Sequence, residues 1–268
     1  GGAMKPRKKS FSHRLTVSCL TFTLIPLLVF LAIYSALLSG LLRRNLQQDF
    51  DSRTKMVATQ LDELYAQMSF ISLELLNRSD FFSAIKQLYY NSADPLRLTE
   101  HYYAVMDSMI NYSYFQTTFR ILYLDARGYY YDTDVPLGSR RTVTRVPEEE
   151  LAGYPWLAQA DAAGGRAVQL NLGSNSMTRS DEPALSIVRA LSAPTDTIGY
   201  LIVQVDIQER AYLFDALAAD GAAFGLYSQA GDLLYAAGDF PDWDGDQVLA
   251  ALEAPEAVDG YTLSSFRG

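Results

Sequence analysis

Few side chains in this sequence have the type and spacing needed for catalysis or metal binding. The chain has one cysteine, Cys19, and two histidines, His13 and His101. A single cysteine cannot form an internal disulfide or a multi-cysteine zinc site, and two distant histidines leave little material for a His-rich metal site or a Ser-His-Asp triad. The acidic run at 242–246 lacks the later bidentate glutamate of a calcium loop, so a solvated turn is favoured. We therefore expect no catalytic centre, no metal site and no cofactor.

The remaining polar residues of interest have the chemistry of a binding site. Arg189 lies inside the apolar run 184–191, and burying its charge is costly unless the guanidinium is paired. We expect it either to pair with Asp206 or Asp125 or to face an anionic ligand. The run Tyr129–Tyr131 alternates across a predicted strand, so one side of it can line a pocket while the other packs in the core.

The charges are distributed unevenly along the chain. There are 31 acidic and 22 basic residues among 268, a net charge of −9, and such a chain lacks the basic face that nucleic-acid binding requires. Residues 1–48 contain no Asp or Glu, whereas five Lys and Arg residues occur within the first fourteen positions. Without those five, 17 basic residues remain against 31 acidic ones, so the rest of the chain carries a net charge of −14.

An uncharged apolar segment, 15–42, follows the basic N-terminus. Its 28 residues exceed the roughly 20 that cross a bilayer. A cleaved signal peptide, the competing interpretation, has an apolar region of only about 7–15 residues. Because the N-terminal flank is richer in Lys and Arg than the flank after 42, the N-terminus is expected in the cytoplasm. We predict a cytoplasmic stub, 1–14, a single-pass membrane helix, 15–42, and an extracytoplasmic body.

The elements that position the polar residues begin with a long helix predicted over 43–79. Its apolar residues recur at spacings of three, four and seven, in a heptad-like stripe. They are Leu46, Phe50, Val57, Leu61, Leu64, Met68, Ile71 and Leu75. Two interpretations stay open: the stripe packs on the protein's own domain, or it forms the seam of a parallel homodimer. Asn77–Asp80 interrupts the stripe and can cap a following helix.

From Phe119 onward the pattern changes to short strands separated by turns. Asp125–Gly128 between two aromatic strands predicts a β-hairpin, and Pro95, Pro147 and Pro155 mark helix starts. The expected helices are 81–90, 95–111, a stretch opening at 147–150, 155–163, 209–219 and 247–252. The expected strands are 119–124, 129–132, 167–172, 184–191, 199–207, 223–228, 233–237 and 261–266. The pattern is that of an α+β unit followed by a smaller, incomplete second copy.

This order of elements resembles the extracytoplasmic double-Cache (dCache) sensor region of bacterial transmembrane receptors. The residues that carry the resemblance are the hairpin FRILYLDARGYYYD, the helix start Tyr154–Trp156, the segment ALSIVRALSAPTDTIGYLIVQVDI and the hairpin FGLYSQAGDLLY. It covers about 43–268 and implies PAS-like (Cache) antiparallel sheet domains. The membrane-distal domain is then 80–207 and a partial membrane-proximal domain is 208–268.

In proteins of that family the ligand lies in the distal domain, between the sheet and the short helix that covers it. The resemblance makes Trp156 the first candidate for contacting a ligand, with Tyr154 beside it, and the alternative for Trp156 is a core aromatic residue. Asp206 matches the position of a carboxylate that holds a ligand ammonium, and its alternative is a helix cap. Amino-acid-binding members have an Arg two residues before the Trp and a Tyr after it. Tyr154 and Leu157 occupy those positions, so that mode of binding is not expected.

The closest resemblance is to sensor histidine kinases of Gram-positive bacteria that work with AraC-type response regulators. It implies a small-molecule ligand, a membrane anchor and a homodimer through the long helix, with no nucleic-acid partner. No counterpart of the kinase domains follows within the sequence, so we expect a receptor fragment or a truncated relative with no enzymatic activity of its own. The alternatives are the sensor region of a chemoreceptor, of a cyclic-di-nucleotide enzyme or of a membrane-bound AraC-type regulator, or an adaptor that binds another protein.

Overall fold

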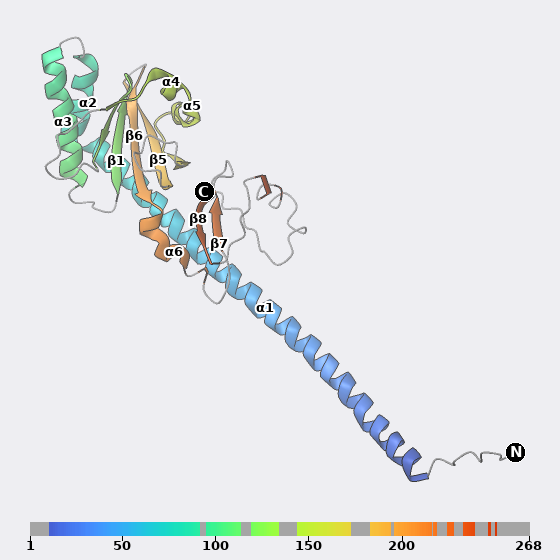
Figure 1. The fold of residues 1–268 in the computed structure, drawn as a ribbon. Coiled ribbons are helices and arrows are strands. Elements are labelled where there is room, and N and C mark those ends of the chain that lie inside the picture. The colour runs from blue at the N-terminus through green and yellow to red at the C-terminus, as the bar shows by residue number, and fades with distance from the viewer. Residues whose placement is uncertain are drawn as a thin grey trace. The chain divides into compact units, whose positions relative to one another are not determined.

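The computed structural model describes residues 11–91, 95–113, 119–133, 144–172, 183–193, 196–215, 217–218, 224–227, 233–238, 246–247 and 250. The chain divides into two compact units, Gly1–Thr54 and Lys55–Gly268. A single helix, α1 (Phe11–Asn77), contributes to both of them (Figure 1). The predicted membrane segment and the predicted long helix are therefore parts of one helix, which Pro26 does not interrupt.

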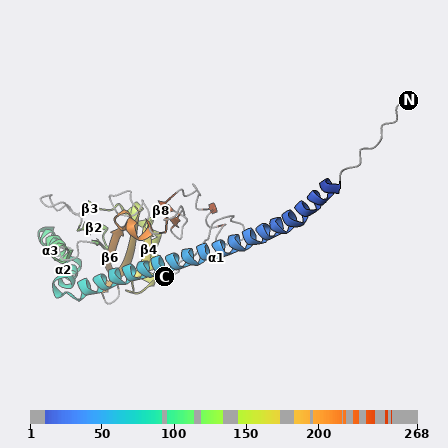
Figure 2. The same cartoon turned by 90° about the horizontal axis from the view of Figure 1, so that it is seen from below.

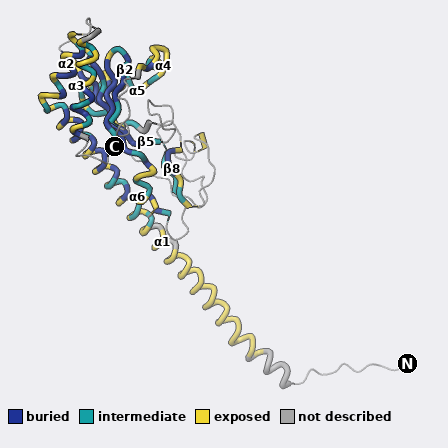
Figure 3. The backbone as a smooth tube through the Cα atoms, turned by 60° about the vertical axis from the view of Figure 1, so that its left-hand side comes forward, coloured by how far each residue is buried: buried dark blue, intermediate teal, exposed yellow. Residues whose placement is uncertain are grey.

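Between residues 20 and 42 of the first unit, α1 is apolar on all sides. Its large side chains between 20 and 42 are exposed, for example Phe22 at 80% and Phe30 at 67% (Figure 3). A helix that is apolar all round is not stable in water and belongs in a membrane or a large core. Among the described residues, α1 is long and apolar enough to span a bilayer, and its apolar window is not buried inside the protein. This agrees with the predicted anchor.

In the second unit one side of α1 is buried against the protein's own domain. Val57, Leu61, Leu64, Met68, Ile71 and Leu75 belong to a single core cluster. The own-domain interpretation of the heptad-like stripe is therefore confirmed for 57–75, and those residues are not available as a dimer seam. Helix α1 ends at Asn77, and α2 (Ser79–Tyr90) and α3 (Pro95–Ser113) follow as the sequence predicts.

Six antiparallel strands form the main sheet of the second unit. They are β1 (Arg120–Asp125), β2 (Tyr129–Asp132), β3 (Thr144–Arg145), β4 (Val168–Leu172), β5 (Ala184–Ala193) and β6 (Asp196–Asp206). Their order is β3-β2-β1-β6-β5-β4. Strands β5 and β6 are longer than predicted, because the pairs Ser192–Thr197 and Ala193–Asp196 continue the β5–β6 ladder beyond a register shift at Leu191/Ser192. The short β3 was not predicted.

The two faces of the sheet are covered by different helices (Figures 1 and 2). Successive side chains of a strand point to opposite faces. Ile121, Tyr123, Ile187, Leu201 and Val203 pack with α1, α2 and α3, and we call this side the α1 face. The other side packs against α4 (Glu148–Ala152) and α5 (Pro155–Ala162), and we call it the α5 face. Its core residues are Leu122, Leu124, Tyr130, Val188, Ala190 and Ile202.

Two glycines in the sheet are required by close packing. Gly128 closes the β1–β2 turn with φ 85°, a left-handed conformation that glycine adopts freely. Gly199 in β6 has no room for a side chain, because an added Cβ would lie 2.6 Å from the Leu124 carbonyl oxygen and from the Tyr123 ring. The Tyr123 hydroxyl donates a hydrogen bond to the Ile198 carbonyl (3.0 Å) across this close approach.

After β6 the chain forms a 3-10 turn, η1 (Gln208–Arg210), and a short helix, α6 (Ala211–Asp215), where a helix to 219 was expected. A two-stranded sheet follows, with β7 (Phe224–Tyr227) paired to β8 (Leu233–Ala237), which is the second predicted hairpin. Phe214 of α6 stacks on Phe224, 5.8 Å between ring centroids. The predicted strand 261–266 and most of the predicted helix 247–252 lie outside the described residues.

Candidate functional site

The α5 face is the side of the sheet that carries the first candidate residue. Trp156 of α5 is 5% exposed. Its ring stacks on Tyr154, 5.7 Å between centroids, and meets the edge of Tyr200 at 5.9 Å. The indole Nε1–H is buried and has no hydrogen-bond partner. Trp156 is thus a core aromatic residue of α5, and it also holds a donor that is unused on this face.

The neighbours of Trp156 are fixed by hydrogen bonds at the ends of α4 and α5. The Tyr154 hydroxyl donates to Glu150 (2.5 Å), and the Tyr200 hydroxyl donates to the Asp161 carboxylate (3.0 Å). Burial and these carboxylates raise the pKa of both tyrosines, so the hydroxyls keep their protons and act as donors. Tyr154 therefore lies beside Trp156, as expected from the sequence, with its hydroxyl already occupied.

A polar row crosses the α5 face further along the strands. In the sheet register Gln204 of β6 lies opposite Ser186 of β5 on one side and opposite Arg120 of β1 on the other. Residues opposite one another have Cβ atoms about 5 Å apart. Ser186 is fully buried and Gln204 is 3% exposed, yet the Ser186 hydroxyl and the Gln204 Oε1 have no hydrogen-bond partner. Buried polar atoms without partners are uncommon in proteins.

An ion pair closes one end of this polar row. Arg120 donates from Nε to Asp132 (2.8 Å) and from Nη2 to the other carboxylate oxygen, a two-point contact that is mostly shielded from solvent. Such two-point guanidinium–carboxylate contacts are directional as well as strong. The row Arg120–Gln204–Ser186, with Asp132, thus offers donors and acceptors on a face that is otherwise apolar.

Asp206 lies at the end of β6 on the same face. Its Oδ1 accepts a hydrogen bond from the Gln208 backbone N–H (2.7 Å), at the start of η1. This bond closes the turn that leads into η1, although the N-cap position of η1 itself is Ile207 and has no side-chain cap. Whether Asp206 also meets a ligand ammonium stays a prediction.

Three other predicted residues, Arg189, Tyr129 and Tyr131, lie on the α1 face and are separated from Trp156 by the sheet. Arg189 donates to the Ser72 hydroxyl (3.2 Å), to the Gly165 carbonyl (2.5 Å) and, more weakly, to the Ser69 hydroxyl (3.5 Å). The expected ion pairs with Asp206 or Asp125 are wrong. The side chain of Asp206 follows the other parity of its strand, and Asp125 is bonded to Arg127 (2.8 Å).

Tyr129 and Tyr131 pack with the helices, and the residue between them, Tyr130, points to the α5 face. Tyr102 of α3 contacts both rings, at 5.4 and 5.5 Å between centroids. Of this run, Tyr130 is the residue that shares a face with Trp156. The sequence predicts that these three tyrosines alternate between the two faces. It does not predict which of the two faces α5, with Trp156, covers.

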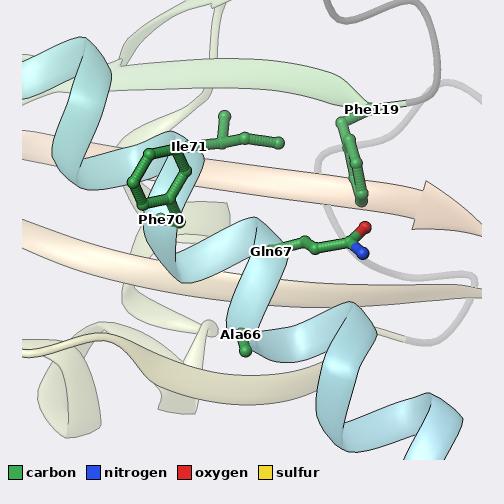
Figure 4. Close-up of a pocket in the computed structure, with 5 residues that line it drawn as sticks. All are labelled: Ala66, Gln67, Phe70, Ile71 and Phe119. Carbon is green, nitrogen blue, oxygen red and sulfur yellow. The ribbon is translucent and has the colours of Figure 1, made fainter.

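A surface cavity of about 350 Å³ lies beside α1 on the α1 face (Figure 4). Ala66, Gln67, Phe70 and Ile71 of α1 line it together with Phe119, which precedes β1. Among these described lining residues, Gln67 alone has side-chain hydrogen-bonding groups, so this cavity offers a mainly apolar surface. It is distinct from the polar row.

No cluster of three or more metal-ligating His, Cys, Asp or Glu side chains occurs within the described ranges. The polar row itself escaped the sequence reasoning, because Ser186 and Gln204 are ordinary residues in apolar strands. Their spacing could have indicated that they are buried. Ser186 lies two residues from Val188 and Gln204 two residues from Ile202, so each side chain points to the same apolar face of the sheet as its neighbour.

The sequence matches no protein-family model and no curated protein. The fold, in contrast, is similar to several solved structures. One is the sensor domain of the V. cholerae histidine kinase DctB, at 12% identity and TM-score 0.53, covering 83% of this chain and 79% of that one. Another is a domain of a putative sensory box/GGDEF family protein from Vibrio parahaemolyticus, at 13% identity and TM-score 0.54, covering 80% and 84%.

A third similar structure is the ligand-binding domain of the Campylobacter jejuni chemoreceptor Tlp3 in complex with L-valine. It shares 13% identity at TM-score 0.52, over 80% of this chain and 81% of that one. These neighbours are Cache-type sensor domains of receptors. The chain therefore has the mixed α+β, PAS-like Cache fold, with a long N-terminal helix followed by an antiparallel sheet domain, as the sequence resemblance implied.

Proposed function

We propose that this chain is the sensor module of a membrane receptor and that it binds a small molecule at the polar row of the α5 face. The observation that carries the proposal is the coincidence of three buried, unpartnered polar atoms on that one face: Trp156 Nε1, Ser186 Oγ and Gln204 Oε1. Each such atom lowers stability by about 1–3 kcal/mol. A ligand that supplies the missing partners of Ser186 and Gln204, which lie opposite one another, relieves both of those costs together.

The charges around the row favour a neutral or cationic ligand over an anion. The guanidinium of Arg120 is already engaged at two points by Asp132. Asp206, at the neighbouring position of β6, adds a further carboxylate to this face. The ligand should therefore present at least one donor for Gln204 and one acceptor for Trp156, as a sugar, a polyol or an amide does. The L-valine complex belongs to the chemoreceptor domain. Tyr154 and Leu157 depart from the pattern expected of amino-acid-binding members of the family that the sequence resembles, which argues against that binding mode here.

The membrane topology and the receptor class are inferred from charge distribution and from the sequence resemblance. We propose that the basic N-terminus is cytoplasmic, that α1 crosses the membrane once and that the second unit is extracytoplasmic. The receptor class proposed is a sensor histidine kinase paired with an AraC-type response regulator, on the basis of the sequence resemblance. A homodimer would form through the side of α1 that remains free, where Met56, Phe70 and Leu73 are 46%, 65% and 46% exposed.

The test is a thermal-shift screen of the full chain in detergent micelles or nanodiscs against sugars, polyols, amides, amino acids and organic acids. A ligand at 100 times its Kd raises the stability of the folded state by about 2.7 kcal/mol. For a domain of this size that is a rise in Tm of roughly 5–10 °C. The shift should disappear in Gln204→Met and persist in Gln67→Met, a matched change in the separate apolar cavity.

A screen without any shift across these classes would contradict ligand sensing and favour the protein-binding adaptor. A shift that survives Gln204→Met but is lost in Gln67→Met would move the ligand to the cavity beside α1. Either result would remove the polar row from the proposed site.

A further inference from the structure

Arg189 is a buried cation whose contacts join three separate elements. It extends from β5 and is 7% exposed. Its Nε and Nη2 donate to Ser72 and Ser69 of α1, and its Nη1 donates to the carbonyl of Gly165. Gly165 ends the turn that leaves α5, the helix that carries Trp156. Through one side chain, α1 is therefore hydrogen-bonded to the end of the helix over the opposite face.

The position of Gly165 at the edge of the sheet explains how Arg189, on the α1 face, contacts the turn that follows α5. Strand β4 begins at Val168, opposite Val188, so β5 has no β4 partner at Arg189. The chain leaving α5 passes this open edge, where a Cβ on Gly165 would lie 3.6 Å from the Ala190 carbonyl. Gly165 has φ +82°, a left-handed conformation that favours glycine. This backbone conformation sets the direction of the Gly165 carbonyl.

The energetic cost of Arg189 argues against a purely structural role. Burial lowers the pKa of its guanidinium, and within the described residues no carboxylate lies within ion-pair distance of it. A buried charge without an ionic partner is costly, and even buried ion pairs can often be replaced by apolar residues of similar volume without loss of stability. What an apolar residue cannot replace is the directional link from Gly165 to Ser69 and Ser72.

We propose that Arg189 is the positioning residue that couples α5 to α1, so that displacement of α5 on the α5 face changes the position or local stability of α1 around Ser69–Ser72. The link consists of Trp156 and the rest of α5, the Gly165 carbonyl, the Arg189 guanidinium and the two serine hydroxyls. Because α1 also contains the apolar segment of the first unit, this link would pass a binding event toward the membrane. In that respect the proposal rests on the proposed function.

The test measures the coupling without any ligand, using Trp156→Phe as the perturbation of α5. Amide hydrogen exchange of α1 peptides covering 64–77 is compared in the full chain in nanodiscs, for the wild type, Trp156→Phe, Arg189→Met and the double variant. We expect Trp156→Phe to speed exchange at 69–75 by about fivefold in the presence of Arg189 and by less than twofold in its absence. Arg189→Met by itself should leave Tm within about 2 °C of the wild type.

Two further variants separate this link from general loosening. Arg166→Met removes a neighbouring arginine whose described side-chain hydrogen bond, to the Ala163 carbonyl, stays within the same turn, so the effect of Trp156→Phe on α1 should persist. Arg189→Lys keeps the charge but replaces the planar fork of donors by a single nitrogen, which cannot reproduce the spacing of the three guanidinium contacts, so coupling should be partly restored.

An equal effect of Trp156→Phe on α1 exchange with and without Arg189, or no effect in the wild type, would overturn the proposal. A fall in Tm of more than about 5 °C in Arg189→Met would do the same, because it would assign Arg189 to the stability of the fold. The exchange experiment contains no ligand, so its failure leaves the thermal-shift test of ligand binding unaffected, and the reverse also holds.

Discussion

Two buried serines of the sheet domain allow a direct test of the site, because they differ in one respect. Ser186 and Ser72 are both fully buried. The Ser186 hydroxyl has no partner, whereas the Ser72 hydroxyl donates to the Ser69 carbonyl (2.7 Å) and accepts from Arg189 (3.2 Å). The same substitution, Ser→Ala, should therefore have opposite effects at the two positions.

The magnitudes follow from the hydrogen bonds that each change removes. Ser186→Ala removes an unsatisfied group whose burial costs about 1–3 kcal/mol, so we expect the unliganded protein to gain about 1 kcal/mol, or roughly 2–4 °C in Tm. Ser72→Ala loses a satisfied hydrogen bond and leaves the Nε of buried Arg189 without its partner. We expect it to lose about 1–3 kcal/mol, or roughly 2–12 °C.

The assay is thermal and urea unfolding of the full chain in detergent, followed by tryptophan fluorescence and by circular dichroism. A destabilised Ser186→Ala, comparable with Ser72→Ala, would refute the reasoning, because it would mean that the Ser186 hydroxyl is satisfied in the folded protein. The stabilised variant should also lose the thermal shift given by any ligand that binds the polar row, so that stability and binding change in opposite directions.

Three further predictions concern the packing of the domain, its alkaline stability and its self-association. Gly199→Ala should destabilise the second unit by about 1–3 kcal/mol, since the new Cβ would lie 2.6 Å from the Leu124 carbonyl oxygen. In the control variant Gly40→Ala the new Cβ meets nothing within 4 Å, so the change should be neutral. Equal Tm values for the two variants would contradict the packing argument. Burial raises the pKa of Tyr102 from 10.0 to about 12, so the stabilising contribution of its protonated hydroxyl is present below pH 10 and is lost as the pH rises toward 12. Tyr102→Phe should therefore make the unfolding free energy fall less steeply over that pH range. An unchanged slope would contradict the raised pKa. Phe70→Asp, at an exposed position, should abolish a dimer in sedimentation experiments and leave Tm unchanged. Met68→Asp, at a fully buried position, should lower Tm. A dimer that persists in Phe70→Asp would place the dimer interface elsewhere.

Features that depend on nearby residues were predictable from the sequence. The hairpin around Asp125–Gly128 and the starts of α3 and α5 follow from turn residues and prolines, whose effects act within a few positions. The same local rules failed where a ladder overrode them. The segment 192–198 reads as a connection, yet most of it is paired in β5 and β6, because hydrogen bonds to a neighbouring strand outweigh weak turn preferences.

The candidate site was predicted only in part, because a periodic pattern does not say which face of a sheet a given helix covers. Trp156, Tyr154 and Asp206 do lie on one face. Arg189 and the outer two tyrosines of 129–131 lie on the other, since their strands present them to α1 and α3. The unpartnered atoms of Ser186 and Gln204 could not be anticipated, because a missing hydrogen bond is a property of the surroundings and not of the residue type.

The sequence by itself determined the segregation of charge, the apolar segment, the long helix and the α+β order of elements. Composition and short-range periodicity depend only on the order of residues along the chain, so they are present before the chain folds. The tertiary structure decided which segments became neighbours. Pairing of β1 with β6 brings Gln204 beside Arg120, and packing of α1 on the sheet brings Ser72 to Arg189. The polar row and the link to α1 both arise from these long-range contacts, which depend on how all the apolar faces are buried at once.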